Sequence, residues 1–147
     1  MICADASIAI KWLLNEERSD RARALYSAAA QSREPIVAPP LLPLEVTNIL
    51  RQRMRTKDGL TLDAASQHLA DFLALRIEFH NPTGLHYQAL VLADALELPA
   101  TYDAHYLALA EHLGCELWTD DQRLMREVAT SLPFVRWVGD HPATVAG

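Results

Sequence analysis

The sequence has 147 residues, of which half are hydrophobic and only five are glycine, so it predicts a compact globular domain and excludes a disordered chain. With 13 basic and 19 acidic residues the formal net charge is −6, which excludes binding of nucleic acid through overall charge alone. Two possibilities remain: nucleic acid is not involved, or some acids bind metal ions that cancel their charge.

Apolar runs and helix-capping residues predict two strands and four helices in the first half of the chain. The second strand must stop at Pro39 and Pro40, because proline cannot donate a hydrogen bond to a central ladder. Ser19 and Thr61 are the expected N-caps of the second and fourth helices, and Gly59 is expected to separate the third helix from the fourth. The expected elements are a strand at 2–4, helices at 8–14 and 20–30, a strand at 35–38, and helices at 43–57 and 62–74.

Strands and helices continue to alternate in the second half. Polar and apolar residues alternate at 76–79, as in a half-buried strand. Apolar residues from Leu85 to Leu96 share one helical face. The next helix is expected to open at Asp103 and to end at the C-cap Gly114. The remaining expected elements are a strand at 115–118, a helix at 122–129, a strand at 134–138 and a loose tail at 139–147.

Strands separated by helices imply parallel pairing, with helices on both faces of the sheet. The expected fold is therefore α/β, a three-layer α/β/α sandwich with a central parallel five-stranded sheet, formed by one domain over residues 1–147. In such sheets, ligands bind beyond the carboxyl ends of the strands, near the reversal of strand order. Acidic residues at those ends are the first candidates for a functional site.

Four acidic residues stand near such positions: Asp5, Glu45, Asp103 and Asp121. Taken singly, each has a structural explanation, since an aspartate can cap a helix and a glutamate in a first turn favours the helix dipole. Taken together they are harder to explain. Glu45 has apolar neighbours on both sides, and no Lys or Arg lies within three residues of it, of Asp5 or of Asp103.

If these four carboxylates converge, protons or metal ions must relieve their repulsion. A ligand set made only of carboxylate oxygens suits a hard divalent cation, Mg²⁺ or Mn²⁺. The six histidines and the two cysteines, Cys3 and Cys115, show no metal-binding spacing. We expect the cysteines to be buried free thiols.

Four motifs in this order resemble those of the PIN-domain nucleases, from Ile2 to about Val138. Each motif is weak alone, whereas all four in order and on matching elements are specific. The compact length is similar to that of the VapC-like toxins within this family. The motifs are Asp5-Ala6-Ser7, followed by a helix and an acid at Glu16 or Glu17; residues 38–48 around Glu45; residues 102–111 around Asp103; and Leu117-Trp118-Thr119-Asp120-Asp121.

The resemblance implies a sheet order of 3-2-1-4-5, which would place Asp5 and Asp121 side by side and Cys3 and Cys115 on adjacent strands. It also implies that Asp5, Glu45, Asp103 and Asp121 hold Mg²⁺ or Mn²⁺ and catalyse hydrolysis of RNA phosphodiester bonds. The main ligands would be the three aspartates, with Glu45 holding a second ion or orienting the water. Ser7, Asn48 and Thr119 would support the acids or contact phosphate.

The fourth motif normally reads Thr-x-Asp, so the ligand is expected to be Asp121, two residues after Thr119. Side chains of successive strand residues point to opposite faces, so Asp120 is expected to face outward or to cap the helix that follows. A substitution of Asp120 should therefore cost little.

The resemblance further implies an RNA substrate, a small antitoxin partner and a homodimer, with Trp12 and Leu13 as part of an apolar groove for the partner. Asp5 interrupts any N-terminal signal core, and no apolar run is long enough for a bilayer, so the expected location is the cytoplasm. The basic run 51–57 is either the solvated end of a helix or a surface that follows phosphates.

Two alternatives to a ribonuclease toxin follow from the same sequence. A phosphoryl-transfer domain of the receiver or haloacid-phosphatase kind would also be three-layered. It should show an acidic pair before the first helix and a late lysine, whereas the only lysines here are Lys11 and Lys57. A PIN-like module without activity, binding RNA or protein, is the second alternative, and the four intact acids argue against it.

Overall fold

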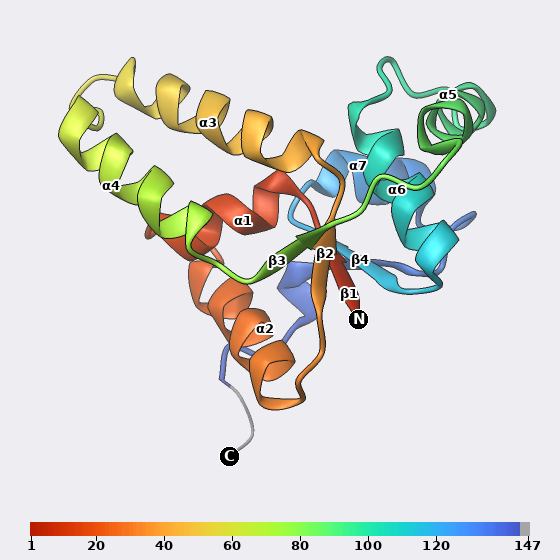
Figure 1. Ribbon diagram of the computed structural model, residues 1–147, viewed down its shortest axis with the longest axis horizontal. Coiled ribbons are helices and arrows are strands. Elements are labelled where there is room, and N and C mark those ends of the chain that lie inside the picture. The colour runs from red at the N-terminus through yellow and green to blue at the C-terminus, as the bar shows by residue number, and fades with distance from the viewer. Residues whose placement is uncertain (145–147) are drawn as a thin grey trace.

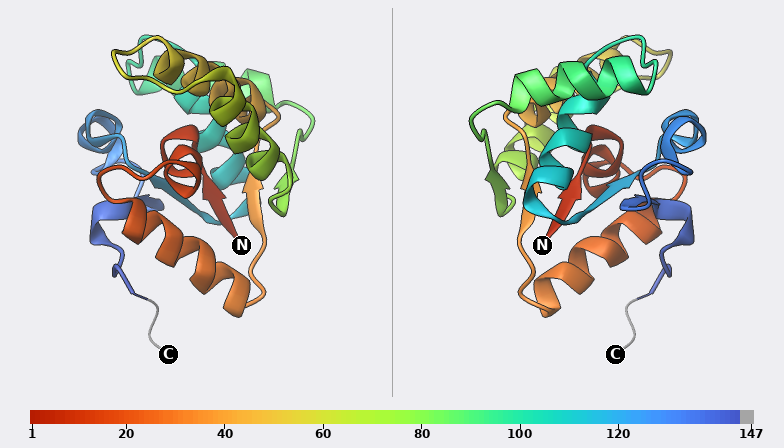
Figure 2. Two further views of the ribbon diagram at one scale, coloured as in Figure 1. Left: turned by 90° about the vertical axis from the view of Figure 1, so that its left-hand side faces the viewer. Right: turned by 90° about the vertical axis from the view of Figure 1, so that its right-hand side faces the viewer.

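The structure is a computed structural model that describes residues 1–144. Five parallel strands form one sheet in the order β3-β2-β1-β4-β5, with helices on both faces (Figures 1 and 2), which confirms the expected fold class and strand order. The strands are β1 (Ile2–Ala4), β2 (Ile36–Ala38), β3 (Ile77–Phe79), β4 (Glu116–Thr119) and β5 (Val135–Trp137). The helices are α1 (Ala6–Leu13), α2 (Ser19–Gln31), α3 (Leu41–Met54), α4 (Leu62–Leu73), α5 (Leu85–Ala95), α6 (Tyr102–Leu113) and α7 (Gln122–Val128), with a short 3₁₀ helix η1 (Val138–Asp140).

The central strand β1 is buried on both faces and separates two apolar clusters. Cys3 packs into the larger cluster with residues of α3, α5 and α6, whereas Ile2 and Ala4 pack into the smaller one with residues of α2. A strand with solvent on neither face reads as a continuous apolar run, which explains why β1 shows no polar alternation. Both cysteines are buried and free, as expected.

Helices α3 and α4 pack against each other and extend away from the sheet as a helical arm (Figure 1). Thr61 caps α4 by accepting a hydrogen bond from the Ala64 amide, and Gly114 ends α6 in the left-handed conformation, as expected for both. In residues 1–144, none of the helices has the length and apolarity needed to cross a membrane.

Several helix boundaries differ from those expected. The first helix begins at Ala6 instead of after Ser7, because Asp5 itself is its N-cap. Ser19 is the first residue of α2 and not its cap: its hydroxyl donates to the Leu14 carbonyl and accepts from the Glu16 amide. Asp103 lies inside the first turn of α6.

The segment after β5, expected to be loose from Gly139, begins with an ordered turn. Val138, at the start of η1, is completely buried in the smaller cluster. The His141 carbonyl accepts a hydrogen bond from Arg21, and the His141 ring contacts Trp118 edge-on at 5.4 Å between ring centroids. Apolar contacts with α2 and β4 therefore hold this segment. Residues 145–147 of the expected tail lie outside the described residues.

Candidate active site

Asp5 lies where β1 ends and α1 begins, and it is only 5% exposed. One of its carboxylate oxygens, Oδ1, accepts hydrogen bonds from the Ser7 hydroxyl at 2.5 Å and from the Ile8 amide at 3.2 Å. Burial raises the pKa of Asp5 to about 7, the nearby charge of Asp103 also raises it, and hydrogen bonds from Ser7 and Thr119 lower it. The fold therefore holds Asp5 in a place that disfavours its charge unless a cation is present.

Ser7 and Thr119 connect the end of β1 to the turn after β4. The Ser7 hydroxyl accepts from the Asp120 amide at 2.8 Å and lies 3.4 Å from the Thr119 hydroxyl oxygen. Thr119 is completely buried, and its hydroxyl oxygen accepts from the Asp121 amide at 3.0 Å. These two residues, expected beside the acids, fix the backbone that carries Asp5 and Asp121.

Asp121 is the N-cap of α7. Its Oδ1 accepts from the amides of Arg123 at 2.9 Å and Leu124 at 3.1 Å. Within residues 1–144 no protein group donates to its other oxygen, Oδ2, so the cap leaves one oxygen for a ligand. Capping and ligation, which looked like competing explanations in the sequence, are compatible in one carboxylate.

Asp120 neither faces outward nor caps a helix, so that expectation is wrong. Arg18 binds both of its oxygens, at 2.6 and 3.1 Å, and Lys11 contacts Oδ2 at 3.0 Å. The Asp120 side chain is 9% exposed and that of Lys11 is 8% exposed. Burial alone would raise the pKa of Asp120, but the hydrogen bonds from Arg18 and Lys11 hold it below its ordinary value. Asp120 belongs to a semi-buried ion network.

Asp103 is the electrostatic centre of the cluster of Asp5, Glu45, Asp103 and Asp121, which we call the acidic cluster. Its charge raises the pKa of both Asp5 and Glu45. The pKa of Asp103 itself is raised first by burial and then by the charge of Asp121. Asp103 thus interacts electrostatically with each of the other three acids, although the four come from separate segments of the chain.

Glu45 is held by Tyr106, a residue that the sequence analysis assigned no role. The Tyr106 hydroxyl donates to Glu45 Oε1 at 2.6 Å, and Tyr106 is 1% exposed. Burial raises the pKa of Glu45, the Tyr106 hydrogen bond lowers it and the charge of Asp103 raises it. The sequence does contain a signal for this contact, because Tyr106 follows Asp103 by three residues and so shares its face of α6.

The structure brings the four predicted acids to one end of the sheet, together with Ser7 and Thr119. Asn48 is exposed on α3, one turn after Glu45, and within residues 1–144 its side chain makes no hydrogen bond. In the same range, no three His, Cys, Asp or Glu side chains already form a metal-binding group. The carboxylates would therefore have to draw closer around an ion.

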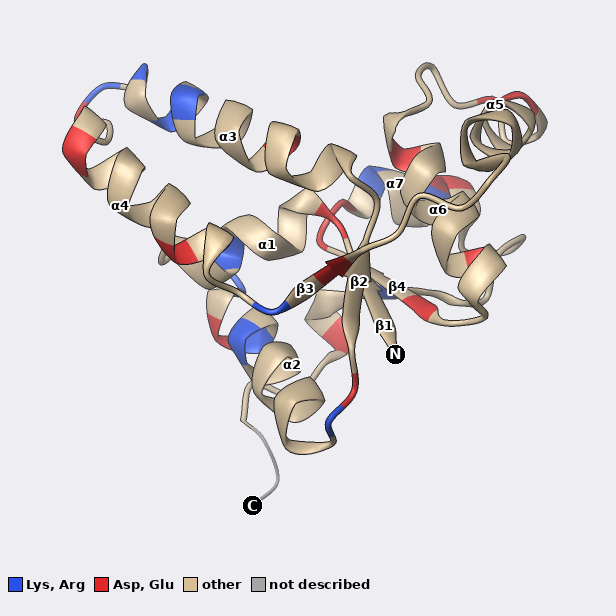
Figure 3. Ribbon diagram, in the orientation of Figure 1, with Lys and Arg blue, Asp and Glu red and all other residues tan. Residues whose placement is uncertain are grey.

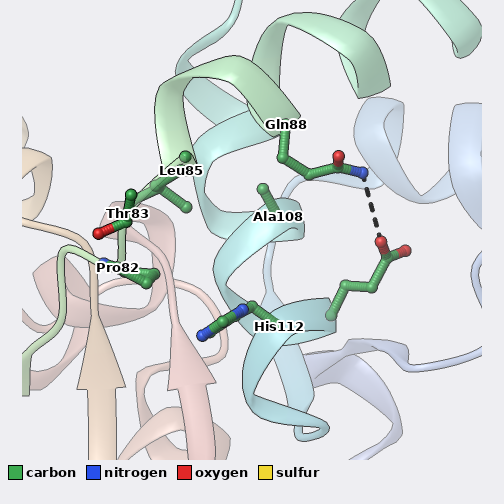
Figure 4. Close-up of a pocket in the computed structure, with 8 residues that line it drawn as sticks. Pro82, Thr83, Leu85, Gln88, Ala108 and His112 are labelled. Atoms are coloured by element: carbon green, nitrogen blue, oxygen red, sulfur yellow. Dashed lines mark hydrogen bonds between the residues drawn. The ribbon is translucent and has the colours of Figure 1, made fainter.

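A hollow that contains none of the four acids lies beside α5 and α6. It lies between the turn before α5, α5 itself and the C-terminal half of α6, and Gln88 donates to Glu111 across it at 3.5 Å (Figure 4). The residues lining it include none of the four acids; they are Pro82, Thr83, Gly84, Leu85, Gln88, Ala108, Glu111 and His112. Asp103 lies in the first turn of the same helix, at its opposite end.

Comparison with known proteins gives a consistent classification. The PIN domain family model matches residues 2–130. The chain is 34% identical over 124 residues to ribonuclease VapC9 of Mycobacterium tuberculosis, covering 84% of this chain and 88% of the relative. It is also 34% identical over 128 residues to ribonuclease VapC3 of Pyrobaculum aerophilum, covering 84% of this chain and 91% of the relative. The chain therefore belongs to the PIN-domain family, and within it to the VapC ribonucleases.

Solved structures support the same fold. PAE2754 of Pyrobaculum aerophilum matches with a TM-score of 0.66 at 24% identity, covering 94% of this chain and 89% of that chain. VapC20 of Mycobacterium tuberculosis, a toxin that cleaves the sarcin-ricin loop, matches with a TM-score of 0.65 at 16% identity, covering 90% of this chain and 96% of that chain.

Proposed function

We propose that this protein is a divalent-metal-dependent endoribonuclease that hydrolyses RNA phosphodiester bonds and acts as the toxin of a toxin–antitoxin pair. The observation that carries the proposal is the acidic cluster, in which Asp103 interacts with the other three carboxylates at the carboxyl end of the sheet. The VapC ribonucleases that resemble the chain over most of its length support the same activity.

The donor set fits a hard cation. The cluster offers only carboxylate oxygens, which Mg²⁺ and Mn²⁺ prefer, and includes a carboxyl whose pKa is raised to about 7 by burial. A bound cation would offset this repulsion and desolvation. Asp5, Asp103 and Asp121 would be the main ligands, and Glu45 would hold a second ion or orient the water.

When bound, the cation would supply an activated water for attack on phosphorus and would stabilise the leaving 3′ oxygen. The protein's own residues do the positioning. Ser7 holds Asp5 at 2.5 Å, and Tyr106 holds Glu45 at 2.6 Å. The cap of α7 fixes Asp121 through Oδ1, and no group in residues 1–144 donates to Oδ2. The products should carry 5′-phosphate and 3′-hydroxyl ends.

A PIN-like module without activity, the alternative, is not favoured. All four acids are present, and the pKa of each of Asp5, Glu45 and Asp103 is raised by burial, at a cost in stability that a binding module would gain nothing by keeping.

A small antitoxin would bind the toxin and restrain it. The predicted groove includes Leu13, which lines a hollow between α1 and the α3–α4 arm together with Leu14 and Leu60. Trp12 does not belong to this hollow: its indole donates to the Ala22 carbonyl at 2.8 Å, and its ring contacts Tyr26 at 5.2 Å between centroids. The antitoxin site is thus proposed at Leu13 and not at Trp12.

A homodimer would use the outer face of α5. Tyr87, Leu90 and Val91 on this helix are 78%, 61% and 50% exposed. Contiguous exposed apolar patches mark sites of protein association, and these three side chains are neighbours on one helix.

Cleavage of RNA by the purified protein tests the proposed function. Activity should require Mg²⁺ or Mn²⁺, stop with EDTA and return when excess Mn²⁺ is added. Sequencing of the fragments should find 5′-phosphate and 3′-hydroxyl ends. Full activity in EDTA, or 2′,3′-cyclic phosphate ends, would contradict the mechanism.

A further inference from the structure

A polar face of α3 leads away from the acidic cluster. Asn48, Arg51, Gln52 and Arg55 are all exposed. Asn48 follows Glu45 by three residues, Arg51 and Gln52 follow Asn48 by three and four, and Arg55 follows Arg51 by four. Residues at this spacing are neighbours on a helix surface. At 1.5 Å per residue, the face extends about 15 Å from Glu45 to Arg55. Lys and Arg gather on the outer half of α3 in Figure 3.

Arg51 and Arg55, the two arginines of this face, have no acidic partner among residues 1–144. Within residues 1–144 neither Arg51 nor Arg55 forms an ion pair, and no side-chain hydrogen bond is made by Asn48 or Gln52. Arg53 on the same helix differs, because it points back to Glu16 at 3.3 Å.

Stabilisation of the C-terminal end of α3 explains the row of exposed amides and arginines only in part. Cations near the C-terminus favour the helix dipole, and Arg51 and Arg53 both lie in the last turn of α3. The dipole gives no reason for the amide side chains of Asn48, which precedes both arginines, and of Gln52, which lies between them. A row of hydrogen-bond donors that begins beside the acidic cluster suits a ligand with repeated negative groups.

We propose that Asn48, Arg51, Gln52 and Arg55 bind the backbone phosphates of the RNA strand on one side of the scissile bond. This inference rests on the proposed ribonuclease function. A chain of net charge −6 repels RNA overall, so a local row of cations is needed to bring a phosphodiester to carboxylates. Guanidinium groups suit this role, because they donate two parallel hydrogen bonds to a phosphate.

The chain offers a matched control. Arg76 is also exposed and, within the described residues, forms no ion pair, but it stands just before β3, at the amino end of the sheet. Because the acidic cluster lies at the carboxyl end, Arg76→Gln removes the same charge far from the proposed strand path. Lys57 is a less suitable position for a charge substitution, because the acid Asp58 follows it directly in the chain.

The test is steady-state cleavage of a short fluorophore- and quencher-labelled single-stranded RNA of mixed sequence, with Mn²⁺, over a range of KCl concentrations. Arg51→Gln and Arg55→Gln should each raise KM roughly fivefold and leave kcat unchanged. Each should also reduce the slope of log(1/KM) against log[KCl] by about 0.7, and the double variant by about 1.4. Arg76→Gln should behave as the wild type.

Two results would overturn the inference. If the wild type cleaves the RNA and the double variant keeps the wild-type KM and salt slope, the α3 face does not bind RNA, while the proposed function stands. If Arg76→Gln changes KM and slope as much as the α3 variants do, the effect comes from net charge and not from a strand path. A wild type without Mn²⁺-dependent cleavage would contradict the proposed function itself.

Discussion

Asp120 and Asp121 are adjacent in the chain, yet their carboxylates have different partners. Asp120 is bound by Arg18 and Lys11. Asp121 caps α7 with one oxygen, and its negative charge raises the pKa of Asp103. The roles of two neighbouring acids are thus set by what the surrounding elements bring to them. Substitution by asparagine separates the two roles, because it removes the charge and keeps the size.

Asp121→Asn should reduce RNA cleavage by orders of magnitude while the protein stays folded, because asparagine caps helices as well as aspartate does. Asp120→Asn should instead lower the free energy of unfolding by about 2 kcal/mol or more, since it weakens charged hydrogen bonds to Arg18 and to the buried Lys11. For a chain of this length the thermal midpoint should fall by roughly 4–8 °C. Thermal melts and cleavage rates of both variants check this, and an Asp120→Asn protein as stable as the wild type would contradict the role of the ion network.

Asp5 makes the stability of the metal-free protein depend on pH. Burial raises its pKa to about 7 in the fold, above the ordinary value of 3.8. The folded state therefore binds the proton more tightly than the unfolded state, and stability is lost as the pH rises from about 4 through about 7. Asp5→Asn keeps the oxygen that caps α1 and removes this titration.

In EDTA, Asp5→Asn and the wild type should be about equally stable near pH 4. At pH 8 the variant should be more stable, by an amount on the order of 2–4 kcal/mol. Urea unfolding at several pH values measures the difference. If the difference in free energy of unfolding between the two proteins does not change with pH, the pKa of Asp5 is not raised in the folded state.

At the scale of elements, the site depends on the junction between β1–α1 and β4–α7. Ser7 supplies this junction, because its hydroxyl donates to Asp5 and accepts from the Asp120 amide. The register of β1 and β4, with Ala4 beside Trp118, brings the two strand ends together. Ser7→Ala would leave the Asp120 amide without a protein acceptor.

Ser7→Ala should lower the free energy of unfolding by about 1–3 kcal/mol and raise the Mn²⁺ concentration needed for half-maximal cleavage. Thr47→Ala is the matched control, because Thr47 is exposed and, among residues 1–144, its hydroxyl donates only to the Pro43 carbonyl of its own helix. Melting curves of the two variants measure the loss of stability, and Mn²⁺ titrations of their cleavage activity measure the metal requirement. An equal Mn²⁺ requirement in both would remove Ser7 from the positioning of the site.

The sequence predicted much of this level of structure, for local reasons. Alternating elements, Thr61 and Gly114 gave the order of strands and helices, because capping and periodicity depend on near neighbours. The error at Ser19 came from contacts with Leu14 and Glu16 nearby in the chain, but other errors came from distant partners. Asp120 meets Arg18, 102 residues away, and Tyr106 meets Glu45, 61 residues away. The segment at Val138–His141 is held by α2 and β4, and no pattern in its own residues indicates those contacts.

At the scale of the whole molecule, the exposed apolar face of α5 predicts association. Light scattering at micromolar concentration should find a dimer, and Leu90→Glu with Val91→Glu should give a monomer, because two charges would be buried without partners. Leu62→Glu with Leu73→Glu is the control, since these leucines of α4 are 66% and 65% exposed and lie outside α5. A wild type that stays monomeric, or a control that dissociates equally, would refute the α5 interface.

The acidic cluster is proposed to be the metal-dependent catalytic site, and Asp103 is the residue to change. Its charge raises the pKa of Asp5 and Glu45, and the charge of Asp121 raises its own pKa. The measurement is the single-turnover rate of RNA cleavage in Mn²⁺ by the wild type, Asp103→Asn and Glu111→Gln. Glu111 is an exposed acid on the same helix, where it contacts Gln88. We expect cleavage by the wild type and by Glu111→Gln that EDTA abolishes, and a rate lower by orders of magnitude for the folded Asp103→Asn. Cleavage by Asp103→Asn at the wild-type rate would show that the acidic cluster is not the catalytic site.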